Sequence, residues 1–164
     1  MEKLAYDFYH RPCLEVARDL VGKVLVYNGN RLRISETEAY CGESDTACHA
    51  SRGRTKRTEV LYMDAGTVYV YLCYGVHWLL NIVTGEEEQP EAVLIRACVD
   101  AQGPGRLTKA LGITGQLNRT SVLDGDLWIE DDGFSCGIRL EKRVGIGYAS
   151  QEDQDRLWRF VMDK

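Results

Sequence analysis

The stretch of sequence that decides the fold is RLRISETEAY, residues 31–40. Strict alternation over this length is typical of a β-strand with one buried face. The even-numbered positions, which we expect on one face of this strand, carry Leu32, Ile34, Glu36, Glu38 and Tyr40. The stretch therefore predicts a long strand that sets two carboxylates among apolar side chains.

These carboxylates allow two interpretations. A carboxylate that shares a face with Leu32 and Ile34 is costly to bury without a partner. Burial raises the pKa of such a group, which suits proton transfer near neutral pH. Alternatively, the end of the strand reaches solvent, and Glu36 and Glu38 are simply hydrated. On the strand alone, the hydrated interpretation is the better one.

The flanking sequence predicts further elements. Upstream we expect a helix over 13–21, begun by Pro12 and stopped by Gly22, a strand over 23–27, and a tight turn at Asn28-Gly29. Downstream, strands are predicted over 67–74, 78–84, 92–98, 127–130 and 138–141, with a helix over 103–111 that ends at Gly112. Ser150 is expected to cap a short helical turn, and 158–162 is either a strand or the end of that helix.

Strands 67–74 and 78–84 lie at hairpin distance. Tyr69 and Tyr71 share one face of the first strand, and Gly75 ends its run of aromatic and β-branched residues. Tyr74 is therefore expected at or beside the tip of the hairpin. A large aromatic exposed there can mark a wedge that binds a partner, whereas a Tyr74 that folds back onto the sheet would be structural.

Together these elements predict an α+β fold. The sequence shows no internal repeat, low-complexity stretch or linker, so we expect one domain over residues 1–164. Its core should be a mostly antiparallel, curved sheet with a few peripheral helices and a protruding β-hairpin.

Composition narrows the class of protein. The chain has 164 residues, 45% hydrophobic and 27% charged, which suits one globular domain. We find neither an apolar run long enough to cross a bilayer nor a signal-peptide core in the first ten residues, and we expect a cytoplasmic or nucleoid-associated protein.

Charge is unevenly distributed. The net charge of −5 argues mildly against a nonspecific nucleic-acid coat protein. A basic run nevertheless spans residues 51–57 and contributes Arg52, Arg54, Lys56 and Arg57. Such a cluster is either a solvated loop or a site for DNA phosphates, and the sequence leaves both open.

The six cysteines are Cys13, Cys41, Cys48, Cys73, Cys98 and Cys136. Without a secretory signal we expect them to be reduced, with buried thiols acting as small hydrophobic groups. Cys41, Cys48 and His49 could instead hold zinc, but the short paired spacing of structural zinc sites does not occur. We expect no metal site.

Several blocks, taken in order, carry a resemblance to a known family. They are Glu36–Tyr40, followed by His49 and Arg52-Gly53; 66–71, running into Tyr74-Gly75 and Asn81; 93–97; 103–107; and 143–147. Together they resemble the alkyladenine (3-methyladenine) DNA glycosylases of the mammalian type, over essentially the whole chain. The stretch between Cys98 and Gly103 is short for that family.

The resemblance implies a role for each matched residue. Glu38 matches the carboxylate that deprotonates a water aimed at C1′ of a flipped nucleotide, and Arg96 matches the arginine that helps to hold this water. Residues that match the substrate pocket are Tyr40, His49, Tyr71 and Asn81. Asn81 is implied to exclude guanine-type bases. Tyr74 matches the side chain that enters the minor groove and fills the vacated space.

Physical chemistry agrees with these roles. Chemistry on a base requires its removal from the stack, and an intercalated aromatic recovers part of that cost. Alkylation makes a purine cationic, so rings such as those of Tyr40 and Tyr71 attract it. Leu94 lies on the same strand face as Arg96, and we expect it to line the substrate pocket. Beside these groups, the catalytic interpretation of Glu38 becomes the better one.

The expected activity is excision of alkylated or deaminated purines (3-methyladenine, 7-methylguanine, hypoxanthine) from double-stranded DNA by a monomeric enzyme without a cofactor. The block Glu36–Tyr40 contains no lysine for a Schiff base, so we expect a monofunctional glycosylase that does not nick the strand. Two alternatives are a noncatalytic module that binds DNA lesions and a hydrolase of free nucleosides.

Overall fold

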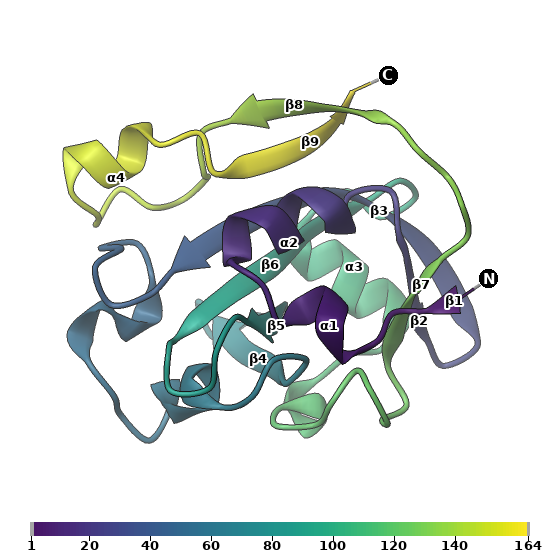
Figure 1. The fold of residues 1–164 in the computed structure, drawn as a ribbon, viewed down its shortest axis with the longest axis horizontal. Coiled ribbons are helices and arrows are strands. Elements are labelled where there is room, and N and C mark those ends of the chain that lie inside the picture. Colours follow the sequence, from purple (N-terminus) through teal and green to yellow (C-terminus); the bar gives the residue numbers. More distant parts are fainter. Residues whose placement is uncertain (1, 164) are drawn as a thin grey trace.

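The computed structural model of the protein describes residues 2–163 and shows a curled antiparallel sheet with short helices around it (Figure 1). The path through the sheet is β1-β7-β2-β3-β6-β5-β4, and β9, itself paired with β8, joins at β3. The strands are β1 Glu2–Lys3, β2 Val24–Tyr27, β3 Asn30–Cys41, β4 Val68–Cys73, β5 His77–Thr84, β6 Glu91–Cys98, β7 Trp128–Asp131, β8 Gly137–Glu141 and β9 Arg159–Asp163. This architecture confirms the predicted α+β class with a mostly antiparallel sheet.

Strand β3 is the central element of the sheet. Its first residues pair with β2, and its second half pairs with β6 and also with β9. Asn28 and Gly29 both have positive φ, +52° and +75°, which joins β2 to β3 in the tight turn that the sequence predicted. The strand thus links all parts of the sheet.

The predicted alternation along β3 is wrong in its second half. Ile34 lies in the main core, yet so does Ala39, an odd-numbered position, because the register between β3 and β6 is irregular on both sides of Glu36. Beyond this irregularity Thr37 faces helix α2 (Cys13–Leu20), where its hydroxyl donates to the carbonyl of Ala17 at 2.6 Å. Glu38 therefore does not share a face with Leu32 and Ile34.

Four short α-helices surround the sheet within residues 2–163: α1 Tyr6–Tyr9, α2 Cys13–Leu20, α3 Pro104–Leu111 and α4 Gln151–Asp155. Helix α2 crosses in front of β6 in Figure 1 and buries Val16, Ala17 and Leu20. Helix α3 buries Leu107 and Leu111 in the same core and ends at Gly112, in the left-handed conformation, as predicted. None of the helices described here has the length and apolarity needed to span a membrane.

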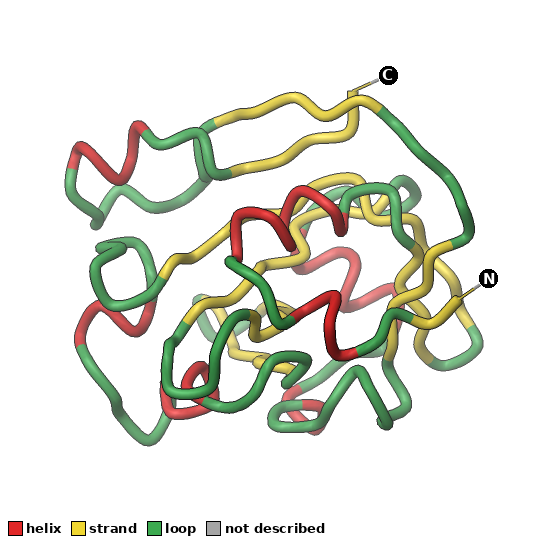
Figure 2. Tube along the Cα trace, in the orientation of Figure 1, coloured by secondary structure: helices red, strands yellow, loops and turns green. Residues whose placement is uncertain are grey.

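Long loops connect these elements (Figure 2). The segment between β3 and β4 contains two 3-10 helices, His49–Arg52 and Thr58–Tyr62, which the sequence did not predict. Near the C-terminus, Ser150 caps α4 by accepting from the Asp153 amide, as predicted, and the ambiguous segment 158–162 is a strand, β9. Strands β8 and β9 form an antiparallel pair at one edge of the molecule, and α4 lies in the segment that connects them (Figure 1).

The expectation that all six cysteines are reduced is wrong for one pair. Cys13, at the start of α2, and Cys41, at the end of β3, form a disulfide with a Cα–Cα distance of 6.3 Å, within the usual range. Their 28-residue separation hid this proximity from local pattern analysis. Cys48, Cys73, Cys98 and Cys136 are free thiols.

Candidate active site

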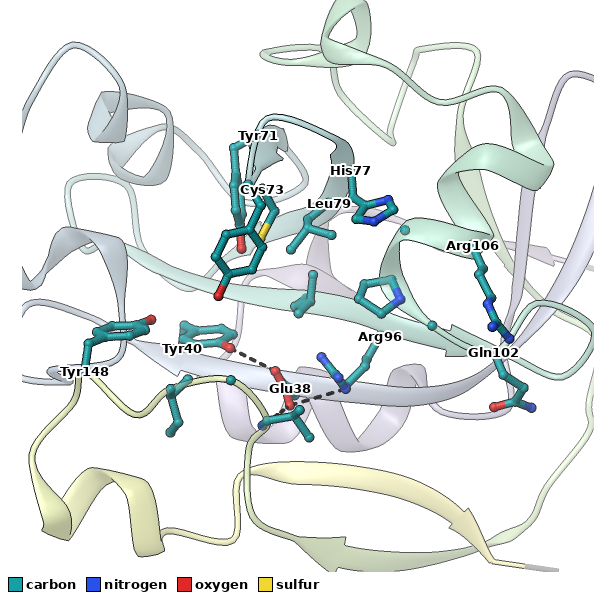
Figure 3. A pocket seen from close by; sticks show the side chains of 18 residues that line it. Glu38, Tyr40, Tyr71, Cys73, His77, Leu79, Arg96, Gln102, Arg106 and Tyr148 are labelled. Atoms are coloured by element: carbon teal, nitrogen blue, oxygen red, sulfur yellow. Dashed lines mark hydrogen bonds and ion pairs between the residues drawn. The ribbon is translucent and has the colours of Figure 1, made fainter.

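A cavity of about 460 Å³ opens over the second half of β3 (Figure 3). Its walls come from β3, β6, the β4–β5 hairpin, the start of α3 and the loop between β8 and α4. We call it the main pocket. Of the residues proposed from sequence, those that line it are Glu38, Tyr40, Tyr71, Tyr74, Leu94 and Arg96.

Glu38 is the central acidic group of the main pocket, and its side chain is 0% exposed. Its Oε1 accepts from the Tyr40 hydroxyl at 2.9 Å, and its Oε2 accepts from the Val144 amide at 2.8 Å. The Arg96 Nε lies 3.6 Å from Oε2 (Figure 3). The carboxylate is therefore held in one orientation, which excludes the hydrated interpretation of Glu38.

Burial raises the pKa of Glu38, while Arg96, the Val144 amide and the Tyr40 hydroxyl each act to lower it. The net direction is upward because loss of hydration outweighs these contacts. A carboxylate with a raised pKa is a stronger base, so Glu38 has the character needed to take a proton from water.

Glu36, the second carboxylate of the strand, has a different environment. It is half-buried, and its Oε1 accepts from Arg159 Nη1 at 2.5 Å. It lines a separate cavity together with Ser35 and Val99. The two carboxylates of the ETE motif are thus divided between two cavities, and only Glu38 faces the main pocket.

The register of the sheet determines which side chains form the floor of the site. Glu38 on β3 stands opposite Leu94 on β6, Leu94 stands opposite Asn81 on β5, and Asn81 stands opposite Tyr69 on β4. Residues directly opposite each other in an antiparallel sheet have neighbouring side chains. Four side chains from four strands therefore form one continuous row, which brings Glu38 and Asn81 together across 43 positions of sequence.

An aromatic slot adjoins the main pocket. The His49 and Tyr71 rings lie 4.5 Å apart between centroids, and Tyr69 and Tyr71 lie 5.4 Å apart. With Tyr40 and Asn81 they border a small cavity of about 30 Å³, which we call the base slot. The structure thus brings together the four residues that the resemblance assigned to base binding.

His49 is neutral at physiological pH. Burial, together with the charge of Arg57, lowers the pKa of its ring to about 4. Its Nδ1 is 2.9 Å from the Tyr69 hydroxyl, which fixes the ring in the slot. The slot therefore presents neutral groups to a ligand.

Two guanidinium groups contact the rings of the slot. The Arg143 guanidinium carbon lies 5.0 Å from the centre of the Tyr40 ring, and that of Arg57 lies 5.3 Å from the centre of Tyr71. Each ring thus already has a cation over one face. A cationic base can therefore make cation–π contacts only with the opposite faces of the Tyr40 and Tyr71 rings.

The β4–β5 hairpin carries Tyr74 at its tip, as predicted. The Tyr74 side chain is 90% exposed, so it does not fold back onto the sheet. Its φ is +52°, a rare conformation for a bulky residue, and Gly75 follows with φ +67°. Leu72 and Val76 are exposed beside it, which makes the tip apolar.

The basic run splits into different environments. Arg52 and Arg57 line a groove of about 500 Å³ beside the base slot, which we call the basic groove. Arg54 instead forms an ion pair with Glu88, and Lys56 is exposed. The structure thus brings two of the four predicted phosphate-binding residues into one groove.

Sequence reasoning missed the contributions of the loop between β8 and α4. Val144 supplies the amide that holds Glu38, and Tyr148 borders the main pocket, the base slot and the basic groove. Arg143 in this loop is buried and donates to both carboxylate oxygens of Asp45. The RVGIG block was visible in the sequence, but its sequence separation of 106 residues between Val144 and Glu38 concealed the contact.

The alternative of a zinc site at Cys41, Cys48 and His49 has no geometric support in residues 2–163. Cys41 is bonded to Cys13, and the described chain contains no cluster of three or more His, Cys, Asp or Glu side chains arranged to hold a metal ion.

Comparison of the sequence with known proteins identifies its family. The model of the family described as methylpurine-DNA glycosylase (MPG) matches residues 7–100 and 99–164. The chain belongs to the methylpurine-DNA glycosylase family. The two matched segments meet at residues 99 and 100, within the stretch that was short for the family.

Proteins with similar sequences come from several organisms. A protein of Methanocella arvoryzae named "Putative 3-methyladenine DNA glycosylase" is 45% identical over 98% of this chain and 92% of its own length. Proteins of the same name from Natranaerobius thermophilus and Psychrobacter cryohalolentis are 41% and 42% identical, over 98% and 94% of this chain and 95% and 89% of their own lengths. The similarity therefore extends over both the fold and the segments that carry the candidate site.

Proposed function

We propose that this member of the methylpurine-DNA glycosylase family is a monofunctional enzyme that everts a damaged purine from duplex DNA and hydrolyses its N-glycosidic bond. The substrates are alkylated or deaminated purines such as 3-methyladenine, 7-methylguanine and hypoxanthine. The observation that supports this proposal most directly is the buried carboxylate of Glu38, which lies beside Arg96 in the main pocket, next to the aromatic slot.

Glu38 is the proposed base. A water oxygen attacks C1′ of the everted nucleotide and gives a proton to the Glu38 carboxylate, while the electron pair of the breaking bond stays on the purine. An alkylated purine departs as a neutral base, so little acid catalysis is needed. Arg96, 3.6 Å from Glu38, is placed to help hold this water, and the carboxylate also stabilises positive charge on the sugar.

Tyr74 is the proposed wedge. An exposed ring on an apolar hairpin tip fits insertion into the minor groove, where stacking recovers part of the cost of base eversion. The everted base would enter between Tyr40 and the pair His49 and Tyr71. Asn81, whose amide donates to the Tyr69 carbonyl at 3.2 Å, would face the base and oppose guanine-type rings.

Further features of the structure support binding to DNA phosphates and cleavage of the base without cleavage of the DNA strand. Arg52 and Arg57 are proposed phosphate contacts, with Lys56 and Arg54 nearby. Among the described residues, no lysine lines the main pocket or the base slot, which supports a monofunctional enzyme. The single-domain, monomeric and cytoplasmic organisation expected from the sequence stays a prediction.

Single-turnover release of free base from duplex DNA treated with a methylating agent tests the proposal. We expect the wild type to release 3-methyladenine and the Glu38→Gln variant to be about 10²–10⁴ times slower. Glu36→Gln is the matched control, because Glu36 lies on the same strand but faces a different cavity, and its rate should stay near that of the wild type. Tight binding without release by the wild type would support a lesion-binding module instead.

The same assay distinguishes the proposed glycosylase from a hydrolase of free nucleosides. The proposed enzyme needs the Tyr74 wedge on duplex DNA, so Tyr74→Ala should slow release from the duplex. A nucleoside hydrolase would cleave free nucleosides readily and would be unaffected by Tyr74→Ala.

A further inference from the structure

The base slot is too small for its proposed ligand. Its volume of about 30 Å³ has room for about two water molecules, whereas a purine has two fused rings. A base that enters the slot therefore extends into a neighbouring space or displaces a wall of the slot.

Tyr148 differs from the other residues that border the slot. It is 62% exposed, whereas the remaining lining residues are buried or half-buried. One side-chain hydrogen bond anchors it, from its hydroxyl to the Ala47 carbonyl at 2.7 Å. Its loop also contains Gly145, with φ +74°, and Gly147, around which no atom lies within 4 Å of an added Cβ. Exposed side chains of this kind change rotamer on a picosecond to nanosecond timescale.

Tyr148 also stands at a junction. It borders the main pocket, the base slot and the basic groove, which has about 500 Å³ of space. Figure 3 shows Tyr148 beside Tyr40, on the side away from Arg96. Together with Cys48 and His49, which border both spaces, it therefore lies between the slot and the groove.

We propose that Tyr148 is a specificity-determining residue, a partition that limits the size of the base that the slot accepts. The inference rests on the proposed glycosylase function. Removal of the ring widens the space between the slot and the basic groove, so a purine with an additional fused ring gains room. A larger ring at this position reduces the space further.

Selectivity between two lesions tests this inference. The rate constants for release of ethenoadenine, which carries an extra ring, and of 3-methyladenine are measured in single turnover, and their ratio is compared among variants. We expect Tyr148→Ala to raise the ratio at least tenfold and Tyr148→Trp to lower it. Because both rates come from one preparation, the ratio is independent of the folded fraction.

Phe134→Ala is the matched control, since Phe134 is an exposed aromatic of another loop, with Arg33 over its ring at 4.2 Å. It should leave the ratio unchanged. A ratio that is the same in wild type, Tyr148→Ala and Tyr148→Trp overturns the partition. Failure of the wild type to release 3-methyladenine overturns the proposed function itself, so the two failures are distinguishable.

Discussion

Glu38 combines two opposing requirements at the scale of a single residue. A general base must be ionised, yet its complete burial favours the protonated form and raises its pKa. Two hydrogen-bond donors, the Tyr40 hydroxyl and the Val144 amide, and the nearby charge of Arg96 partly offset this cost. The residue that we propose for catalysis therefore destabilises the fold at neutral pH.

The Glu38→Gln variant should gain stability relative to the wild type as pH rises. Because the pKa of Glu38 is higher in the folded than in the unfolded chain, its contribution to stability is full below the unfolded pKa and is lost as pH rises through the folded pKa. Glutamine does not titrate, so the advantage of the variant should grow from pH 4 to pH 8. Urea unfolding at both pH values measures this, and a stability of the variant relative to the wild type that does not rise between pH 4 and pH 8 would contradict it.

At the scale of elements, the two tight turns of the sheet make an informative pair. Asn28-Gly29 and Tyr74-Gly75 have closely similar φ angles, +52° and +75° in the first and +52° and +67° in the second. Asparagine tolerates the left-handed conformation, whereas a bulky side chain there costs about 1–2 kcal/mol. The hairpin thus accepts strain in order to present an exposed aromatic ring, a common property of functional sites.

Exchange of the two turn residues should have opposite effects on stability. Tyr74→Asn is expected to raise the free energy of unfolding by about 1 kcal/mol and to impair base release from duplex DNA. Asn28→Tyr should lower the free energy of unfolding by at least as much, because it also removes the hydrogen bond from Asn28 to the Leu111 carbonyl at 3.0 Å. Denaturant unfolding and single-turnover assays measure both. A destabilised Tyr74→Asn protein would refute the argument from strain.

Elements with local signals were predictable from sequence. The turn at Asn28-Gly29, the end of α3 at Gly112 and the cap at Ser150 depend on residues within one turn of chain, and each was found as predicted. The register irregularity at Glu36 was not predictable, because it arises from pairing with β6, about sixty positions away. For the same reason, the sequence could not show that the core-facing positions change from even-numbered to odd-numbered between the first and second halves of β3.

The candidate site was predictable only where the residues carried a recognisable block. Glu38 and Tyr40 were found by resemblance, and the structure adds their contacts. Tyr148 and the Val144 amide were missed because they reach the pocket from more than one hundred positions away. No periodicity in the sequence encodes such a contact.

At the scale of the whole molecule, acidic net charge must be reconciled with binding to DNA. The chain carries a net charge of −5, so overall electrostatics oppose association with a polyanion. Affinity therefore depends on a local patch, and the basic groove with Arg52 and Arg57 is the patch beside the slot. Arg54, although in the same run, is paired with Glu88.

The salt dependence of DNA binding should distinguish these arginines. In the double variant Arg52→Ala/Arg57→Ala, the slope of log K against log salt should become shallower by about 2, because each phosphate contact contributes about 1. The single variant Arg54→Ala is the control and should keep the slope of the wild type. Fluorescence anisotropy over a range of salt concentrations measures both. An unchanged slope in the double variant would remove the groove from the DNA interface.

The row of Glu38, Leu94, Asn81 and Tyr69 has a consequence for engineering. These four residues lie on paired strands whose ladder hydrogen bonds are made by backbone groups, so changes of similar size at the two middle positions should leave the strand pairing in place. A combinatorial library at Leu94 and Asn81 would change the shape of the cavity floor and leave Glu38, the proposed proton acceptor, in its position.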